Sequence, residues 1–291
     1  MQPVTAAVLE QLVFSKAYFD PEGFLVALAD GVPVGFAHAG FGANDEQTAL
    51  ATELGTTYQL QLRADHRNEA LADELLGRAE NYLRSRGAQV TYAGGIRPLN
   101  AFYLGLYGGS ELPGVLTSDA TFAAACRRGG YREIDRVVVL QLDLAHFRPP
   151  FSRQLRQLRR EMTLVEHYNP PAASWWEACT IGDFERLQFA LQPAGGSEPQ
   201  ARVEFWDIEP LSTAWGVPTA GMLDLEVSGV RRRQGLATFL LGETFERLRA
   251  RGIVRVEAQT MQQNAPAIAL YEKFGFSRVD QGIVYRKDAP T

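Results

Sequence analysis

The sequence predicts an α/β (α+β) protein made of two similar domains, each a mixed β-sheet flanked by helices. Three observations lead to this prediction. Segments with strand and helix periodicity alternate along both halves of the chain, one strand–turn–helix unit occurs twice, and the connections between segments are short. Short connections between alternating strands and helices indicate locally parallel strands. With 291 residues, the chain is also long enough for two compact domains.

The repeat appears when residues 60–72 are aligned with residues 225–237, a shift of 165 positions (235 − 70) that also holds downstream. A strand, a turn and a helix of matching length therefore occur twice, which indicates a duplicated unit. The matched pairs are Arg67 with Arg232, Ala70 with Gly235, Leu83 with Leu248, and Gly87 with Gly252.

The second copy begins with a strand, because residues 220–227 alternate apolar Leu223, Leu225 and Val227 with acidic residues. Apolar residues then follow helical spacing over residues 236–251, and a glycine comes next to end the helix. The remaining elements of this copy are a strand over residues 253–259, a helix over residues 264–274 and a final strand over residues 277–285.

The first copy is preceded by a β-hairpin over residues 24–36, with Asp30-Gly31 at its turn. It ends in a strand that includes residues 137–140. Pro149 and Pro150 follow, and because proline cannot donate a backbone hydrogen bond to a sheet, we place the domain boundary there. The predicted domains are residues 1–148 and residues 149–291.

The composition is that of an ordinary globular protein, with 46% hydrophobic and 22% charged residues. A net charge of −5 gives no general attraction to nucleic acid or to an anionic membrane. No export signal or membrane-spanning stretch is recognised, and two cysteines are too few for a disulfide framework. The four histidines have no metal-ligand spacing. We therefore expect a soluble, cytoplasmic protein without a metal site.

The turn at residues 232–237 has the properties of a phosphate-binding loop. It lies between a strand and a helix, where the first helical amides lack internal partners and the helix dipole is positive. Gly235 has no side chain to keep a phosphate from the backbone, and Ala237 is nearly as small. Arg232 and Arg233 add positive charge. The sequence thus predicts a pyrophosphate site here.

Two segments in the second half resemble motifs of the GCN5-related N-acetyltransferase (GNAT) superfamily. Residues 232–237 resemble its R/Q-x-x-G-x-G/A loop, and residues 264–276 resemble its N-x-x-A-x-x-x-Y-x-x-x-G-F segment. The resemblance implies two GNAT-like domains, each with a partly splayed sheet, of which the second holds the acetyl-CoA site. The first copy is degenerate by comparison, since Ala70 replaces the loop glycine and Cys126 stands at the position of the motif tyrosine.

This resemblance implies a mechanism without an enzyme nucleophile. Acetyl-CoA, the expected co-substrate, would lie between the strand ending at Val227 and the strand ending near Gln259, and the acceptor amine would attack its thioester directly. A backbone N–H near Leu225 to Val227 would polarise the thioester carbonyl, Asn264 would bind the pantetheine arm or shape the site, and Tyr271 would protonate the departing thiolate. The residues expected to hold the pyrophosphate are Arg232, Arg233, Gly235, Leu236, Ala237 and Thr238.

The general base is less well defined by the sequence. Similar amino-terminal acetyltransferases often carry Glu where this chain has Gln259, and an amide cannot accept the proton. Glu226 is the first candidate and Glu257 the second, with Asp224 as a third, and each is equally compatible with a surface carboxylate. About twenty extra residues in the first half, including residues 100–109, either reach over an acceptor pocket or form a packed loop.

The expected acceptor is a primary amine of a small molecule or peptide. A non-catalytic acyl-CoA-binding module is the alternative, suggested by Gln259 and by the decayed first copy. A basic amphipathic segment, residues 151–160, is better explained as a solvated inter-domain helix than as an RNA contact. No nucleic acid or membrane partner is expected, and a homodimer is left open.

Overall fold

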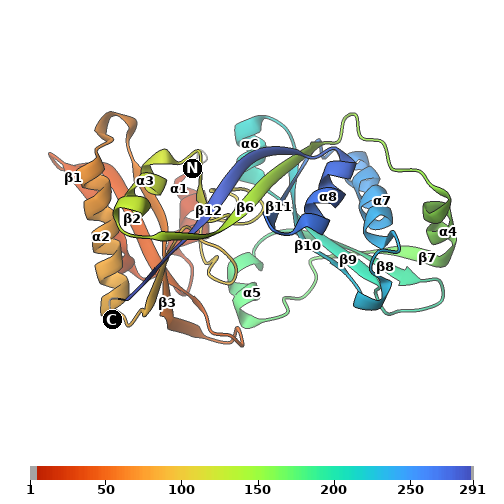
Figure 1. Ribbon diagram of the computed structural model, residues 1–291, viewed down its shortest axis with the longest axis horizontal. Helices are drawn as coiled ribbons and strands as arrows, with labels where there is room; N and C mark the ends of the chain where they lie inside the picture. Colours follow the sequence, from red (N-terminus) through yellow and green to blue (C-terminus); the bar gives the residue numbers. More distant parts are fainter. Residues whose placement is uncertain (1–4, 290–291) are drawn as a thin grey trace.

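The computed structural model describes residues 5–289, so the first four residues of the predicted first domain and the last two of the second lie outside the described residues. The molecule is elongated, with a body formed by the first half of the chain at one end and a body formed by the second half at the other (Figure 1). One mixed sheet runs through both bodies, in the order β1-β2-β3-β4-β12-β6-β11-β10-β9-β8-β7.

The N-terminal half, here residues 5–148, contributes the first strands of this sheet and the helices on it. Its elements are α1 (Ala6–Leu9), η1 (Glu10–Phe14), η2 (Pro21–Gly23), β1 (Phe24–Ala29), β2 (Val32–Ala43), β3 (Leu50–Leu62), η3 (Ala64–His66), α2 (Glu69–Ser85), β4 (Val90–Ala93), β5 (Val115–Leu116), α3 (Ala120–Arg128) and β6 (Arg132–Asp143).

The C-terminal half, residues 149–289, repeats much of this arrangement. Its elements are α4 (Arg153–Glu161), β7 (Met162–Tyr168), α5 (Trp175–Ile181), β8 (Arg186–Pro193), β9 (Ala201–Asp207), α6 (Glu209–Trp215), β10 (Thr219–Val227), η4 (Gly229–Arg231), α7 (Leu236–Ala250), β11 (Arg255–Met261), α8 (Ala265–Phe274) and β12 (Ser277–Asp288).

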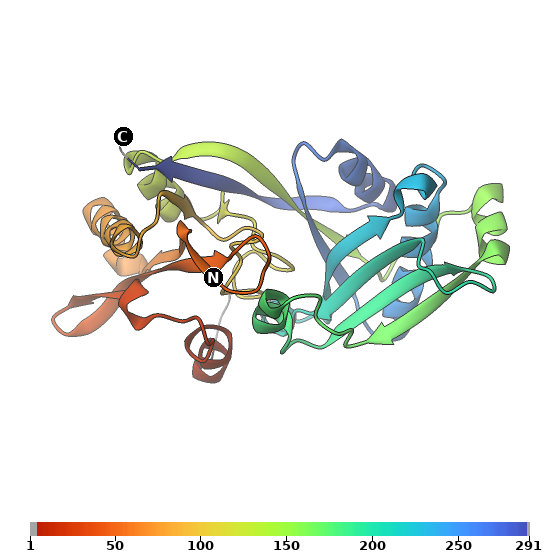
Figure 2. The ribbon, with the colours of Figure 1, turned by 90° about the horizontal axis from the view of Figure 1, so that it is seen from below.

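The two halves exchange their last strands. Strand β6, which ends the first half, pairs antiparallel with β11 of the second half, and β12, which ends the second half, pairs antiparallel with β4 of the first. The two exchanged strands also pair with each other, from Ser277 opposite Gln141 to Arg286 opposite Arg132. Figures 1 and 2 show β6 and β12 side by side as a bridge between the bodies. The predicted boundary near residue 148 stays a prediction, because each body draws a strand from the other half of the chain.

Three apolar cores follow from this exchange. The core of the second body, under α7 and α8, includes Val138 and Leu140 of β6. The core of the first body, under α2 and α3, includes Ile283 and Tyr285 of β12. A third core lies between the bodies and combines residues of both halves, among them Phe102, Tyr103, Trp176, Trp206 and Leu223.

Most predicted elements are confirmed. Asp30 and Gly31 both have positive φ at the hairpin turn, as this two-residue turn requires, and strands β10 and β11 are parallel. The basic segment after the two prolines is helix α4, which packs against α7. The aromatic residues of the extra segment are packed in the inter-body core, Phe102 and Tyr103 included.

The alternation of apolar and exposed acidic residues predicted for β10 is found, but its apolar residues do not all face the same core. Leu223 packs in the core between the bodies, whereas Leu225 and Val227 pack against the core under α7 and α8. The reason is a β-bulge: the pairing with β9 shifts between Leu223 and Glu226, and Asp224 has a left-handed backbone with φ 45°. A bulge adds one residue to one strand, so the side chains after it change faces.

Within residues 5–289, no helix has both the length and the apolar character needed to cross a membrane.

The strand exchange predicts that the two bodies unfold together. Ile283 lies on β12 but is buried in the core of the first body, so Ile283→Ala should lower the free energy of unfolding by about 2–5 kcal/mol. All four tryptophans lie in the second half of the chain, and two of them, Trp176 and Trp206, are in the core between the bodies, so tryptophan fluorescence reports regions outside the core that contains Ile283. The urea midpoint seen by fluorescence should therefore fall together with the midpoint seen by circular dichroism.

Val279→Ala, a change at a half-exposed position of the same strand, is the matched control and should leave both midpoints nearly unchanged. A fluorescence midpoint that Ile283→Ala does not move would show that the bodies unfold independently.

Candidate active site

Strands β10 and β11 separate soon after they pair. Their parallel register covers only Thr219 to Gly221 on one side and Arg255 to Glu257 on the other. Beyond this point β10 continues to Val227 and β11 to Met261, with no further pairing between them in the described register. Each strand therefore carries backbone N–H and C=O groups without a partner from the other, which an extended ligand with amide groups can use.

The bulge at Asp224 lies on β10 just beyond the point of separation. Asp224 receives two hydrogen bonds from Arg97 of the N-terminal half, Nη1 to Oδ1 at 2.5 Å and Nη2 to Oδ2 at 3.2 Å. This ion pair ties the bulge to the other half of the chain. A bulge leaves one residue of the strand outside the ladder, so it frees backbone groups near Leu225, where the resemblance implies an N–H directed at a thioester carbonyl.

The turn after β10 ends in a helix without a side-chain cap. A 3-10 turn at Gly229–Arg231 is followed by Arg233 with φ 59° and Gly235 with φ 80°. Gly235 is the N-cap of α7 and no side chain bonds to the first helical amides; the first helical bond runs from the Phe239 N–H to the Gly235 carbonyl, at 2.9 Å. The first amides of this helix therefore have no side-chain cap and lie at the positive end of the helix dipole, as anion binding requires.

The corresponding turn in the N-terminal half is closed by its own side chain. Asn68 caps α2, and its Oδ1 accepts hydrogen bonds from the Ala70 and Leu71 amides at 2.8 and 3.4 Å. Before it, Asp65 is ion-paired with Arg63 and His66. Two of the amides that a phosphate would use are thus already engaged, which agrees with a degenerate first copy.

Helix α8 carries the predicted acid. Asn264 is its N-cap, with Oδ1 accepting from the Ala267 amide at 3.3 Å and Nδ2 donating to Thr260 Oγ1 at 3.1 Å. Tyr271, two turns into the helix, is buried and packs on Phe276 with ring centroids 5.3 Å apart. Burial, and then the charge of Glu111, raise the pKa of the Tyr271 phenol. The phenol therefore keeps its proton at neutral pH, as an acid must.

Several of the other predicted cofactor residues have side chains packed in the protein, which leaves only their backbone for a ligand. Leu236 and Thr238 are buried within the helix packing, and Leu225 and Val227 pack on the core. Arg232 is the exception, with Nε near the Val227 carbonyl at 3.5 Å. Arg233, Gly235 and Ala237 complete the predicted turn.

The predicted base candidates occupy different environments. Glu226 is 57% exposed and paired with Arg202 of β9 at 2.9 Å. Glu257 is 1% exposed, and its Oε1 accepts from the Ser110 amide at 2.8 Å and from the Ser110 hydroxyl at 3.2 Å. Burial raises the Glu257 pKa to about 7, although the bonds from Ser110 oppose the shift. Beside Glu257 lies a cleft of about 280 Å³.

Ser110 belongs to the extra segment of the N-terminal half, which reaches over β11. We call residues 94–119 the insertion. Gln259 Nε2 donates to the carbonyls of Gly108 and Glu111, both at 2.9 Å. The insertion approaches so closely at Gly109 that a Cβ there would lie 2.0 Å from the Glu257 carboxylate. The segment is therefore packed on β11, and the alternative role, reaching over an acceptor pocket, stays a prediction.

Three residues of the insertion were not singled out from the sequence: Arg97, Ser110 and Glu111. Arg97 joins Glu111, Nε to Oε1 at 3.1 Å, as well as Asp224. Burial alone would lower the Arg97 pKa, but the charges of Glu111 and Asp224 raise it. The only sequence signal was the extra length itself, because the contacts of these residues with the second half join positions more than 100 residues apart.

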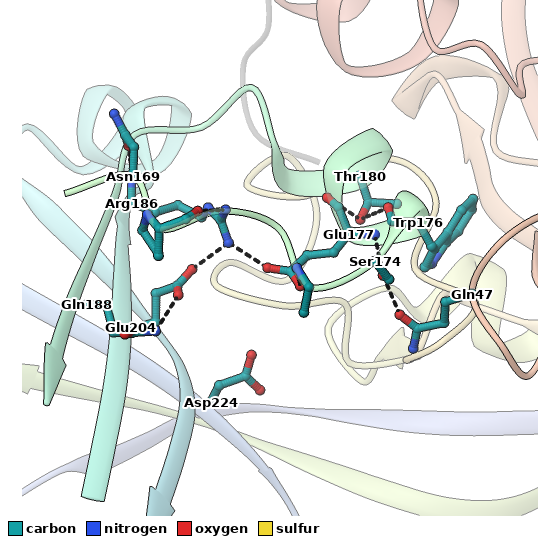
Figure 3. A network of polar contacts seen from close by, with 12 residues as sticks. Gln47, Asn169, Ser174, Trp176, Glu177, Thr180, Arg186, Gln188, Glu204 and Asp224 are labelled. Carbon is teal, nitrogen blue, oxygen red and sulfur yellow. Dashed lines mark hydrogen bonds and ion pairs between the residues drawn. The ribbon is translucent and has the colours of Figure 1, made fainter. Parts of the chain in front are cut away.

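A second polar network lies next to Asp224 (Figure 3). Arg186 is buried and donates to Glu177 at 2.6 Å, to Glu204 at 2.9 Å and to the Pro170 carbonyl at 2.6 Å. In Figure 3 the Asp224 side chain points to the side on which Glu177 and Glu204 lie. Among residues 5–289, no group of three or more histidine, cysteine or acidic side chains is placed to hold a metal ion.

Comparison with known proteins decides the family. A sequence model of the Acetyltransferase (GNAT) family matches residues 4–108 and 166–276, most of the chain and both halves. The chain belongs to the GNAT family. No curated protein matches it.

Solved structures confirm a tandem GNAT fold. A tandem GNAT protein from the clavulanic acid biosynthesis pathway, solved without AcCoA, is 16% identical, with a TM-score of 0.64 over 91% of this chain and 82% of that one. A GNAT protein from Sphaerobacter thermophilus is 15% identical, with a TM-score of 0.60 over 91% and 79%. The glucosamine N-acetyltransferase region of a fungal multi-domain β-N-acetylglucosaminidase is 16% identical, with a TM-score of 0.66 over 89% of this chain and 32% of that one.

The buried state of Glu257 in this GNAT protein predicts a pH-dependent stability. Its pKa of about 7 in the folded protein lies above the ordinary value of 4.5, so the folded state favours the protonated form. The stabilisation is complete below about pH 4.5 and is lost as the pH rises through 7, by about 3 kcal/mol. Glu257→Gln cannot titrate but keeps an oxygen for Ser110. Relative to the native protein, its free energy of unfolding should rise between pH 4.5 and 8, measured by urea denaturation. If the free energies of unfolding of the two proteins changed with pH in the same way, the raised pKa of Glu257 would be contradicted.

Proposed function

We propose that the protein is an N-acetyltransferase that moves the acetyl group of acetyl-CoA to a primary amine of a small molecule or peptide. The observation that carries this proposal is the uncapped N-terminus of α7, which directly follows a strand that has left its parallel neighbour. The reaction site is then in the C-terminal half. The N-terminal half is a degenerate copy, because Asn68 occupies its helix amides.

The residues of the turn fit a pyrophosphate. The amides that begin α7 have no side-chain competitor, and Gly235 leaves the backbone open to a phosphate oxygen. Arg232 and Arg233 supply charge. The unpaired edges of β10 and β11 have the hydrogen-bonding groups that a pantetheine arm needs, and Asn264 shapes the end of the gap by capping α8.

The chain's own residues then divide the transfer step between them. The backbone at the Asp224 bulge, near Leu225 to Val227, polarises the thioester carbonyl. Tyr271 donates its phenolic proton to the departing sulfur. We also place the protein in the cytoplasm, where its two free cysteines stay reduced.

The alternative function is non-catalytic acyl-CoA binding, favoured by the amide of Gln259 in place of a carboxylate. The two functions differ in one measurement. Release of free CoA in the presence of a panel of primary amines supports transfer, whereas tight acetyl-CoA binding without release on any amine supports a binding module.

A carboxylate placed at the uncapped terminus should destroy the phosphate site. Gly235→Asp adds negative charge where the phosphate would lie, and we expect acetyl-CoA affinity, measured by calorimetry, to fall by at least roughly 30-fold, or about 2 kcal/mol. The matched control is Ala70→Asp, the aligned position of the first half, which should change affinity less than roughly 2-fold. An equal loss of acetyl-CoA affinity in both variants, with unchanged circular dichroism, would show that the phosphate site lies elsewhere or involves both halves.

Removal of the phenolic hydroxyl tests the acid. Tyr271→Phe should lower kcat by roughly 10²–10⁴-fold, because the thiolate then leaves unprotonated. The dissociation constant for acetyl-CoA should stay the same, since the hydroxyl is not part of the phosphate site. Initial rates of CoA release and calorimetry give the two values. Full activity of the variant would show that Tyr271 is a structural residue and not the acid.

A further inference from the structure

The proposed transfer requires a group that takes a proton from the acceptor amine, and Gln259 cannot do so. The insertion of the N-terminal half lies directly over this residue. Because Gln259 Nε2 donates to both the Gly108 and Glu111 carbonyls, the backbone of residue 111 is fixed on β11. The Glu111 side chain therefore begins next to Gln259, whose amide stands where similar acetyltransferases often carry a carboxylate.

The Glu111 carboxylate is ion-paired with Arg97 and is near enough to Asp224, Glu257 and Tyr271 for its charge to affect them. Its own segment supplies Arg97, with Nε 3.1 Å from Oε1. From β10 it is opposed by Asp224, from β11 by Glu257, and its charge also acts on Tyr271 of α8. These are the charged and titratable groups that face it from the elements packed around it. The charge of Glu111 thus interacts both with Tyr271, the proposed acid, and with Asp224, the residue at the bulge.

The environment of Glu111 suits a proton acceptor. Its side chain is 26% exposed, so a substrate or a water molecule can reach it. Burial raises its pKa above the usual value, Arg97 opposes this shift and Asp224 adds to it. A carboxylate that binds a proton more strongly than a solvated one is a better base.

An independent observation indicates that a hydrogen-bond donor binds here. Gln259 is 8% exposed, and its Oε1 is buried without a partner among the described residues, while its Nε2 faces three acceptors. This pattern fixes the orientation of the amide. A buried carbonyl oxygen without a donor requires one, and a water molecule that bridges Gln259 to the acceptor amine would supply it.

We propose that Glu111, from the degenerate half, is the general base for acetyl transfer in the other half; this inference rests on the proposed function. Glu111 takes one proton from the acceptor ammonium, directly or through one water, and passes it to solvent. The amine nitrogen forms a bond to the acetyl carbon and the carbon–sulfur bond breaks. Tyr271 gives its proton to sulfur and is restored by the second proton from nitrogen. The reaction thus releases one proton in total.

The surroundings of Glu111 favour a cationic acceptor. Arg97 connects Glu111 to Asp224, and Asp224 lies beside the Arg186 network of Figure 3. Carboxylates outnumber guanidinium groups in this region, so an ammonium ion is attracted and an anionic acceptor is repelled. The carboxylates are Glu111, Glu177, Glu204 and Asp224, and the guanidinium groups are Arg97 and Arg186.

The test uses the full chain with acetyl-CoA and the best amine from the panel. Glu111→Gln should lower kcat/KM by roughly 10²–10⁴-fold while calorimetry gives the native affinity for acetyl-CoA. Glu111→Ala, in which a cavity replaces the side chain, should recover activity when formate is added. Formate also restores the ion pair with Arg97, so rescue is repeated with small carboxylates of different basicity. A rescued rate that rises with the pKa of the added acid indicates a base, because an ion pair alone does not depend on proton transfer.

Glu226→Gln and Glu257→Gln are measured alongside, since both carboxylates are competing candidates. A loss of similar size in either one, together with near-native activity of Glu111→Gln, would assign the base to that residue and overturn the proposal. Loss in Glu111→Ala without recovery in formate would also overturn it. If the native protein binds acetyl-CoA but acetylates no amine, the proposed function itself fails and takes this inference with it.

Discussion

The candidate site depends on two parallel strands that pair at only three positions. β10 and β11 part after Gly221 and Glu257, and this separation has to be maintained against the tendency of free strand edges to pair. Two features oppose closure. The bulge at Asp224 turns β10 away from a regular ladder. The insertion lies over β11, where its Ser110 binds Glu257 and its Glu111 carbonyl accepts a hydrogen bond from Gln259. The separation is thus held in part by residues from the other half of the chain.

The two halves produced by the duplication differ at the turn that precedes the long helix of each. In the second, the first turn of α7 is left open; in the first, Asn68 closes the same turn. The N-terminal half contributes the insertion between β4 and α3. In it, Arg97 binds Asp224 and Ser110 binds Glu257, both acidic residues of the C-terminal half. The shared core of aromatic residues makes this contribution rigid, since Phe102 and Tyr103 are fully packed within it.

Local patterns were enough to predict the parts of the site that depend on neighbours in sequence. Gly235, Asn264 and Tyr271 stand in a turn, a cap and a helix, where spacing fixes the geometry, and these elements are found where expected. The bulge at Asp224 was missed because alternation of Leu223 and Leu225 looks regular until the pairing partner is known. The environments of Glu226 and Glu257 could not be separated either, because burial of Glu257 comes from a segment about 150 residues away.

The strand exchange also bears on how the molecule can be divided. A chain cut between the halves would leave β11 without β6, and β4 without β12, so each fragment would expose an open sheet edge in the middle of its core. A lone half would then complete itself best by trading terminal strands with a second copy, as in a domain-swapped dimer. The present chain thus has the strand arrangement of such a dimer with its two members fused end to end, and the turn that is open in one member is capped by Asn68 in the other.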